Sequence, residues 1–425
     1  MLESGHVDGI MVHQDATNDE GNLEEAKAQK HQDLHTMLAT VLEDFIKIQN
    51  GGFLFDLYYC RFLYKNIEFI PFVPFIKCDT DEADKLCGAY SCRTGGVKQL
   101  CRYCYCPTEK SDRPLADFPF KTMADIQALI DAEDFEGLKA ISQQYIDNAT
   151  YKLRFGMHND RGVHGACPME MLHALLLGIF KYIRDCFFDQ IGPTSVTADD
   201  INALAKEYGD LLHRQSERDI PKTKFAGGIR KGKLMAKEYP GILLCMAALL
   251  RSTQGKKMLL AKCAKFRVEG VLQDWTLLVE ILLQWEMWLK SDHMLKSHVE
   301  RAKERKHWYI MYLIKKVGRR SKGMGLKIQK FHGIMHMAMD IEMYGVPMEV
   351  DTGSNESGHK KSKTAAKLTQ KIKELFDEQT CKRLHEVHLL ELTQEELAGR
   401  PPWECTPMDM SILLTKRPMI MANQN

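Results

Sequence analysis

Residues 157–188 read MHNDRGVHGACPMEMLHALLLGIFKYIRDCFF, and the rest of the chain can be arranged around this stretch. Pro168 is predicted to start a helix, because its missing N–H costs nothing in a first helical turn. Apolar residues then recur at the spacing of one buried helical face: Met171, Leu172, Leu175, Leu176, Ile179, Phe180 and Ile183. The preceding loop carries His158, His164 and Cys167, residue types that ligate soft or borderline metals. The stretch therefore predicts a core helix with candidate ligands at its start.

The side chains of Glu170 and His173 project from the first turns of this helix, about one turn apart. The plainer interpretation is a capping glutamate on a core helix, because acidic side chains favour helix N-termini. Composition alone favours that interpretation. The alternative is a catalytic carboxylate.

A resemblance favours the catalytic alternative. The segment CPMEMLHALLLGIFK resembles the second acidic motif of Plavaka-type transposases, which are relatives of the plant CACTA elements. The matching residues are Cys167, Pro168, Glu170, Leu172, His173, Leu177, Gly178 and Lys181. The resemblance implies a DDE transposase with an RNase H-like catalytic fold. That fold is an α/β mixed sheet with a large all-helical insertion, helix-dominated overall. The family usually has Asp where this chain has Glu170, which fits a degenerate copy. No separate DNA-binding domain is expected before residue 34, which would fit a truncated copy.

The resemblance also assigns the other two catalytic acids. A predicted strand over 66–78 is followed by four acids: Asp79, Asp81, Glu82 and Asp84. Alternatives for this cluster are a solvated turn or a helix start at Asp81. Because α/β folds place their chemistry at the carboxyl ends of strands, the resemblance points to Asp79, with Asp81 as the alternative. The segment VDTGSNESGHKKSKTAAKLTQ implies Glu356 as the third acid, with Glu349 and Asp351 as alternatives. Three such carboxylates would hold two Mg²⁺ or Mn²⁺ ions for phosphodiester cleavage and strand transfer.

The sequence LCRYCYC contains a Cys-x-x-Cys, which in an intracellular protein is either half of a zinc site or a redox pair. Tetrahedral zinc needs four ligands, so further ligands must come from elsewhere in the chain. Cys87 and Cys92 lie upstream, and His158 lies downstream. The predicted ligands of a structural Zn²⁺ are Cys101, Cys104, Cys106, His164 and Cys167. The plainer interpretation is a set of unrelated buried cysteines.

Another candidate metal-binding segment is KFHGIMHMAMD. Its residues His332, His336 and Asp340 share one helix face, at positions i, i+4 and i+8. This face could bind a metal. HGIMH lacks the glutamate of the HExxH motif, so a zinc-protease interpretation is disfavoured. An aromatic stripe over 271–290 is predicted to be core.

The net charge is +1, so contacts with nucleic acid must come from local patches. A glycine-broken basic loop near 222–237 and a basic run over 301–327 are such patches, although each could be a merely solvated surface. The predicted DNA-binding residues are Lys224, Arg230, Lys231, Lys233, Arg319 and Arg320. The expected partners are DNA and a second copy of the chain as a homodimer.

Composition and chain order complete the prediction. The chain is 44% hydrophobic and 27% charged, as is ordinary for soluble globular proteins, and it has no apolar run long enough to span a membrane. Thirteen cysteines and the absence of a secretion signal favour reduced thiols in an intracellular, nuclear protein. We expect a disordered acidic segment over 1–34 and catalytic-domain parts over 35–173 and 341–395. A helical insertion over 174–340 and a proline-containing tail over 396–425 complete the order. Alternatives are an inactive nucleic-acid-binding or scaffolding protein of the same fold, and a zinc-stabilised helical interaction protein.

Overall fold

The computed structural model describes most of the chain. The described residues are 20–59, 62–90, 97–113, 118–158, 160–192, 195–215, 221–230, 232, 234–303, 307–317, 329–347, 350, 352, 362–372 and 375–397. The chain divides into two compact units. The small unit comprises residues 1–12 and 353–425, and within it residues 362–367 and α15 (Phe376–Leu397) are helical. The large unit comprises residues 13–352 and is described from here on.

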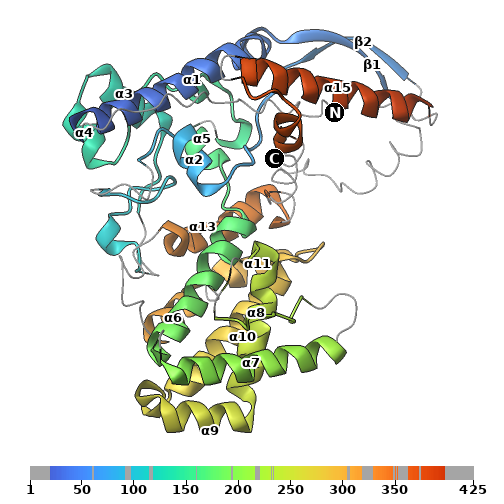
Figure 1. Cartoon of the computed structure of the whole chain (residues 1–425). Helices are drawn as coiled ribbons and strands as arrows, with labels where there is room; N and C mark the ends of the chain where they lie inside the picture. The colour runs from blue at the N-terminus through green and yellow to red at the C-terminus, as the bar shows by residue number, and fades with distance from the viewer. Residues whose placement is uncertain are drawn as a thin grey trace. The chain divides into compact units, whose positions relative to one another are not determined.

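The large unit begins with a long helix, a hairpin and several short helices (Figure 1). These elements are α1 (Glu20–Gly51), β1 (Phe53–Tyr59), β2 (Phe62–Phe69), α2 (Thr80–Leu86), η1 (Thr108–Lys110), α3 (Met123–Asp131), α4 (Phe135–Ala140), η2 (Ala149–Lys152), η3 (Gly156–His158) and α5 (Val163–Ala166). Helix α1 starts well before residue 34, so part of the segment predicted to be disordered is helical.

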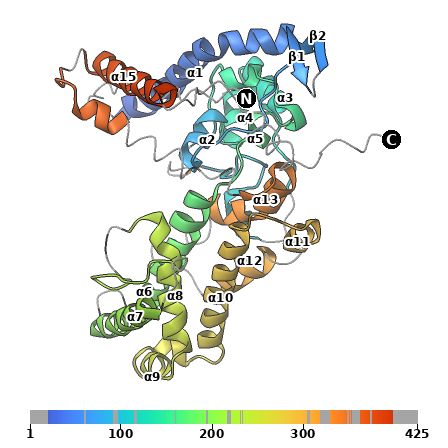
Figure 2. The ribbon, with the colours of Figure 1, turned by 90° about the vertical axis from the view of Figure 1, so that its right-hand side faces the viewer.

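In the remainder of the large unit, the elements that the structure describes are all helices (Figures 1 and 2). Its elements are η4 (Leu172–Phe180), α6 (Lys181–Ile191), α7 (Val196–Gln215), η5 (Ala236–Glu238), α8 (Tyr239–Arg251), α9 (Thr253–Lys262), η6 (Ala264–Arg267), α10 (Val271–Leu289), α11 (Lys296–Arg301), α12 (His307–Val317) and α13 (Gln329–Tyr344). Helix α10 packs against α8 and α12, α7 packs against α8, and α13 packs against η4. Among the described residues, no helix combines the length and the apolar character needed to cross a membrane.

The predicted RNase H-like mixed sheet is wrong, whereas the predicted dominance of helices agrees with the structure. The described residues form one sheet, an antiparallel pair of β1 and β2. The predicted strand over 66–78 ends at Phe69, and residues 70–79 form neither helix nor strand. Single backbone hydrogen bonds from Val73 to Arg154 and from Ile76 to Ala166 do not make a ladder. Pro71 and Pro74 lie in this part, and neither can donate a backbone hydrogen bond to a neighbouring strand.

The helix predicted after Pro168 is the centre of the main core. It begins at Met171 and continues through η4, which is π-helical, into α6. Six of the seven predicted apolar positions are buried, and Leu172 is partly buried against the same core. The stripe of α10 is also core, as predicted: Trp275, Leu278, Leu282, Trp285 and Leu289 are all buried.

The glycine-broken basic segment starts with a stretch that packs tightly between two helices. The Thr223 hydroxyl donates to the Gly209 carbonyl of α7 at 2.9 Å, and the Cys245 thiol of α8 donates to the Thr223 carbonyl at 3.6 Å. A Cβ placed on Gly241 of α8 would lie 1.7 Å from the Lys222 carbonyl oxygen. The absence of a side chain at residue 241 therefore allows this crossing.

We expect Gly241→Ala to lower the free energy of unfolding by about 3 kcal/mol or more, because the new methyl group collides with backbone and not with a flexible side chain. The intrinsic preference of helices for Ala over Gly, about 1 kcal/mol, would offset only part of this loss. Urea titration followed by circular dichroism measures the effect. Gly227→Ala is the control, since nothing lies within 4 Å of its Cβ position. Equal stability of the two variants would contradict the described crossing.

Candidate metal centre

Four buried side chains from two distant segments meet in the large unit. Cys101 and Cys104 come from the loop before η1, and His332 and His336 come from α13. Their ligand atoms all lie within 4.8 Å of one another. Cys104 Sγ is 3.2 Å from His332 Nε2, and Cys101 Sγ is 3.4 Å from His336 Nε2. The two Nε2 atoms are 3.2 Å apart, and Cys104 Sγ is 3.7 Å from His336 Nε2.

These separations match the edges of a zinc tetrahedron. Zn–S bonds of about 2.3 Å and Zn–N bonds of about 2.0–2.1 Å place ligand nitrogens about 3.3 Å apart, and a nitrogen and a sulfur about 3.6 Å apart. The observed separations of 3.2 Å between nitrogens and 3.2–3.7 Å between nitrogen and sulfur lie close to these values. Two thiols and two imidazoles are also a donor set that zinc prefers. The residues therefore fit a zinc ion.

Local structure brings the four ligand side chains together. His332 and His336 are one helical turn apart on α13, so their rings lie on the same face. In the loop, the backbone N–H of Tyr103 donates to Cys101 Sγ at 3.3 Å, which stabilises negative charge on that sulfur. An isolated antiparallel bridge between Cys104 and Phe120 holds the second cysteine.

Aromatic rings enclose the histidines. The Tyr103 ring stacks on the His336 ring, with centroids 4.6 Å apart and an interplanar angle of 13°. Phe118 contacts the His332 ring edge-on at a centroid distance of 6.4 Å. The Tyr103 hydroxyl lies 2.9 Å from Asp340 Oδ2, which also accepts from the backbone N–H of Met169 at 2.9 Å. Thus Asp340, the third polar residue on the face of α13, holds the tyrosine that covers the histidine.

The electrostatics of the cluster favour positive charge beside thiolate. Burial opposes ionisation of Cys101, but its hydrogen bond with Cys104 and the two imidazoles hold the pKa of this thiol well below its usual range. Burial would lower the pKa of His332, but the Cys101 thiolate raises it to about 10. A divalent cation would supply the positive charge that these groups favour, with both imidazoles neutral and both thiols deprotonated.

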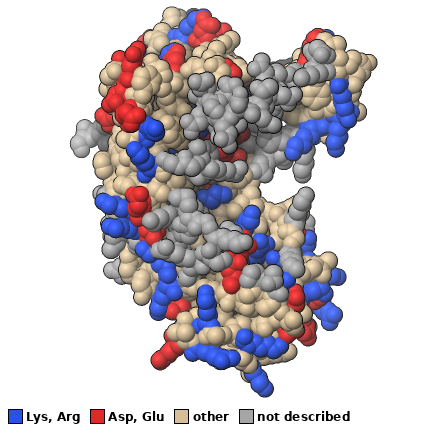
Figure 3. Space-filling model, turned by 60° about the vertical axis from the view of Figure 1, so that its left-hand side comes forward, with Lys and Arg blue, Asp and Glu red and all other residues tan. Residues whose placement is uncertain are grey.

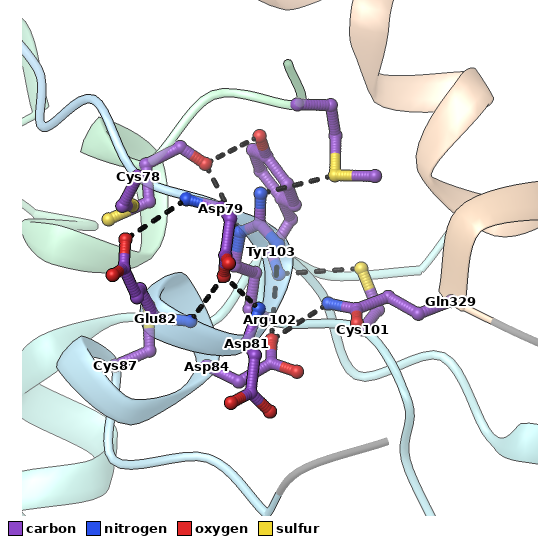
Figure 4. A network of polar contacts seen from close by, with 12 residues as sticks. Cys78, Asp79, Asp81, Glu82, Asp84, Cys87, Cys101, Arg102, Tyr103 and Gln329 are labelled. Atoms are coloured by element: carbon purple, nitrogen blue, oxygen red, sulfur yellow. Dashed lines mark hydrogen bonds and ion pairs between the residues drawn. The ribbon is translucent and has the colours of Figure 1, made fainter. Parts of the chain in front are cut away.

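The middle residues of the Cys-x-x-Cys fix the loop to the start of the core helix. Arg102 is buried, and its guanidinium donates to the carbonyls of Cys167 and Pro168 at 3.1 and 3.3 Å. It also lies 3.9 Å from the buried Asp84 carboxylate, which accepts from Gln329 at 2.9 Å (Figure 4). Burial raises the pKa of Asp84 to about 7, although Arg102 acts to lower it.

Of the five zinc ligands predicted from the sequence, two lie in the cluster and three lie outside it. Cys101 and Cys104 belong to the cluster. Cys106 is buried beside His332, yet it is outside the four-residue set, and its thiol donates to the Pro107 carbonyl at 3.4 Å. His164 and Cys167 lie elsewhere: His164 contacts Tyr151 and the Arg102 carbonyl, and Cys167 contacts other cysteines. The missing half of the site is the histidine pair of α13, which the i, i+4 spacing had marked as able to bind a metal.

The predicted catalytic acids have other roles where the structure describes them. Asp79 is the N-cap of α2 and accepts from the backbone N–H groups of Asp81 and Glu82 at 2.7 and 2.8 Å (Figure 4). Asp81 pairs with Lys85 at 3.0 Å. Glu170 is buried and accepts from the backbone N–H and the ring Nδ1 of His173 at 2.7 and 2.8 Å. Within the described residues, none of these acids belongs to a group of three or more candidate ligands. Glu349, Asp351 and Glu356 lie outside the described residues.

Two of the six predicted DNA-binding residues can be placed. Lys224 is exposed. The Arg230 side chain is only 5% exposed and pairs with Asp199 at 2.7 Å, so it supports the loop and is not available to a phosphate. Lys231, Lys233, Arg319 and Arg320 lie outside the described residues.

Comparison with known proteins finds no matching family model and no matching curated protein. The resemblance to Plavaka-type transposases therefore stays a prediction. The fold and the site define a helix-dominated protein with a buried Cys₂His₂ cluster that could bind a metal such as zinc.

Proposed function

We propose that this chain is a zinc-stabilised helical binding protein, in which one ion joins the loop over 101–106 to helix α13. The observation that supports the proposal is the closed donor set of four buried protein ligands. The N–N and three N–S separations given above are close to those of a zinc tetrahedron. A catalytic zinc site keeps one position for water or substrate, whereas a structural site has four protein ligands. The residue that follows His332 is Gly333, so the general base of a zinc protease is also missing.

Metal analysis of the purified full chain tests this proposal. We expect zinc to co-purify with the wild type, and Cys104→Ser and His336→Ala each to lose one ion per chain. Cobalt in place of zinc should give the visible absorption bands of a tetrahedral ion, together with sulfur-to-cobalt charge transfer. Cys245→Ser is a matched control, because this buried thiol donates to a carbonyl remote from the cluster. Unchanged metal content in both ligand variants would refute the proposal.

We further propose that the binding partner is DNA, reached through the basic surface of α9 and η6. Residues 251–269, which run from the end of α8 through α9 and η6, carry six basic residues and one acid, Glu269. The basic residues are Arg251, Lys256, Lys257, Lys262, Lys265 and Arg267. Figure 3 shows Lys and Arg side chains gathered at the lower end of the view, where Figures 1 and 2 place α9. Arg251 and Lys262 pair with acids of neighbouring helices, whereas Lys257 and Lys265 are exposed. Descent from a Plavaka-type transposase would fit such a partner.

For this surface we expect duplex DNA to bind with an affinity that falls steeply as salt rises. Replacing Lys256, Lys257 and Lys265 by Glu should weaken binding and reduce the slope of log K against log salt by about one unit for each lost phosphate contact. Fluorescence anisotropy over a salt series measures both. The control replaces three other lysines, Lys98, Lys139 and Lys152, at equal change of charge. If both triple variants lose the same affinity, only net charge matters and the α9 surface is not the site.

A further inference from the structure

A second group of soft ligands surrounds the short helices α2 and α5. Cys78 and Cys87 flank α2, with Cys78 just before its N-cap and Cys87 at its C-cap. His164 lies within α5, and Cys167 is its C-cap. The three cysteines belong to one buried cluster and His164 is fully buried. Cys78 and Cys87 appear beside α2 in Figure 4.

The side chains of this group contact one another. Cys78, Cys87 and Cys167 pack in the same buried cluster, where the neighbouring thiols of Cys78 and Cys87 raise the pKa of Cys167. His164 is near enough to Cys87 to act on the pKa of that thiol. Two contacts tie the segments together. The Ile76 N–H donates to the Ala166 carbonyl at 2.7 Å, and the Cys87 thiol donates to the Val163 carbonyl at 3.7 Å.

The imidazole of His164 already has the tautomer of a metal ligand. Its Nδ1 lies 3.1 Å from the Arg102 carbonyl, which can only accept, so Nδ1 carries the proton. Nε2 then presents a lone pair, which accepts from the Tyr151 hydroxyl at 2.9 Å. Metal-bound histidines have this arrangement, with the second ring nitrogen donating to a carbonyl.

The fully buried core around these residues is small, and larger apolar side chains pack on it only while partly buried. Its buried members are Cys78, Ala83, Cys87, Ala89, Leu153, Phe155, Val163, Ala166 and Cys167, so three of the nine are cysteines and three are alanines. Helix α2 has 7 residues and α5 has 4. Short irregular segments with little apolar surface are commonly stabilised by a structural metal.

We propose that Cys78, Cys87, Cys167 and His164 form a second site, a Cys₃His centre for a soft divalent ion such as zinc. Binding releases the three thiol protons to solvent and replaces the Tyr151 hydroxyl at His164 Nε2 by the ion. Among the described residues, the Cys101 group is the one whose ligand atoms all lie within 4.8 Å of one another. The second group is therefore wider and would contract around its ion. The Arg102 peptide would link the centres, since it follows Cys101 and its carbonyl accepts from His164.

Zinc stoichiometry of the full chain, purified under reducing conditions, tests the proposal. We expect two ions per chain in the wild type, one in Cys87→Ser, one in Cys104→Ser and none in the double variant. Cys245→Ser should keep two. Wild-type content in Cys87→Ser overturns the second site, as does a disulfide among Cys78, Cys87 and Cys167 found by mass spectrometry. Loss of one ion from Cys87→Ser but none from Cys104→Ser would support the second site and refute the first.

Cobalt binding to Cys104→Ser keeps the proposal testable if Cys87→Ser does not fold. This variant leaves the second group intact, so it should still bind one cobalt ion with the bands of a tetrahedral, thiolate-rich centre. The wild type should show stronger sulfur-to-cobalt absorption than the variant, because both centres contribute thiolates. If Cys104→Ser binds no cobalt while its circular dichroism matches the wild type, the second site does not exist.

Discussion

Removal of the ion from the Cys₂His₂ centre is expected to lower the free energy of unfolding by at least about 3 kcal/mol, and the melting temperature by about 6–12 °C. The proposed ion would join residues that lie 235 positions apart in sequence. Its loss would remove the closure of a long loop and weaken the packing of α13 on the loop over 101–106. Differential scanning calorimetry of the wild type with and without a chelator, and of His332→Ala, measures the change.

Two controls separate loss of the ion from loss of a side chain. His293→Ala removes an exposed histidine and should change stability by less than about 0.5 kcal/mol. Chelator should have little further effect on His332→Ala if that variant already lacks this ion, apart from any contribution of the second centre. A wild type that melts at the same temperature with and without chelator would mean that the four side chains pack without needing a metal.

Arg102→Met is expected to destabilise the chain by about 3–5 kcal/mol, the second large effect. The substitution keeps much of the volume but leaves Asp84 without its cationic neighbour, and it takes a donor from the carbonyls of Cys167 and Pro168. Removing one partner of a buried ion pair usually costs this much. Here Asp84, whose pKa burial raises to about 7, must either stay charged without Arg102 or take up a proton. Urea denaturation at constant pH measures the loss.

The matched control for Arg102 is Arg251→Met. Arg251 forms an ion pair with Glu280, but its side chain is 64% exposed, so its loss should leave the stability nearly unchanged. The double variant Arg102→Met with Asp84→Asn should recover part of the loss, because no unpaired charge then remains. A double variant as unstable as the sum of the two single variants would show that Arg102 acts through its carbonyl contacts and not through Asp84.

The sequence predicted local elements well, because their signals are local. The apolar spacing from Met171 to Ile183 predicted one face of a helix, and the residues of that face are buried or partly buried. The apolar and aromatic stripe of α10 predicted a second buried face. The interpretation of Asp81 as part of a helix start was also close, since α2 begins at Thr80 with Asp79 as its cap. The predicted mixed sheet failed because a strand needs a partner, and the proline-containing stretch after Phe69 has none in the described residues.

Half of the metal site could be predicted from spacing, and the pairing of its halves could not. The Cys-x-x-Cys indicated two ligands, and the histidines of α13 had the i, i+4 spacing that brings two rings together. No local signal joins residues 101–104 to 332–336, because that contact depends on how α13 packs against η4. The predicted ligands His164 and Cys167 are nearer to the Cys-x-x-Cys along the chain, but Cys167 lies in a different buried cluster.

The two cysteines and the two histidines of the cluster lie far apart in sequence, and this separation has a consequence for the order of events during synthesis. His332 is translated 228 residues after Cys104. At about 5–20 residues per second, roughly 10–45 s pass between the two. During that time the loop over 101–106 has its thiols but not the imidazoles that complete its centre. The growing chain therefore passes through a stage in which a half-formed site is open to oxidation or to the wrong metal, and only synthesis of α13 ends it.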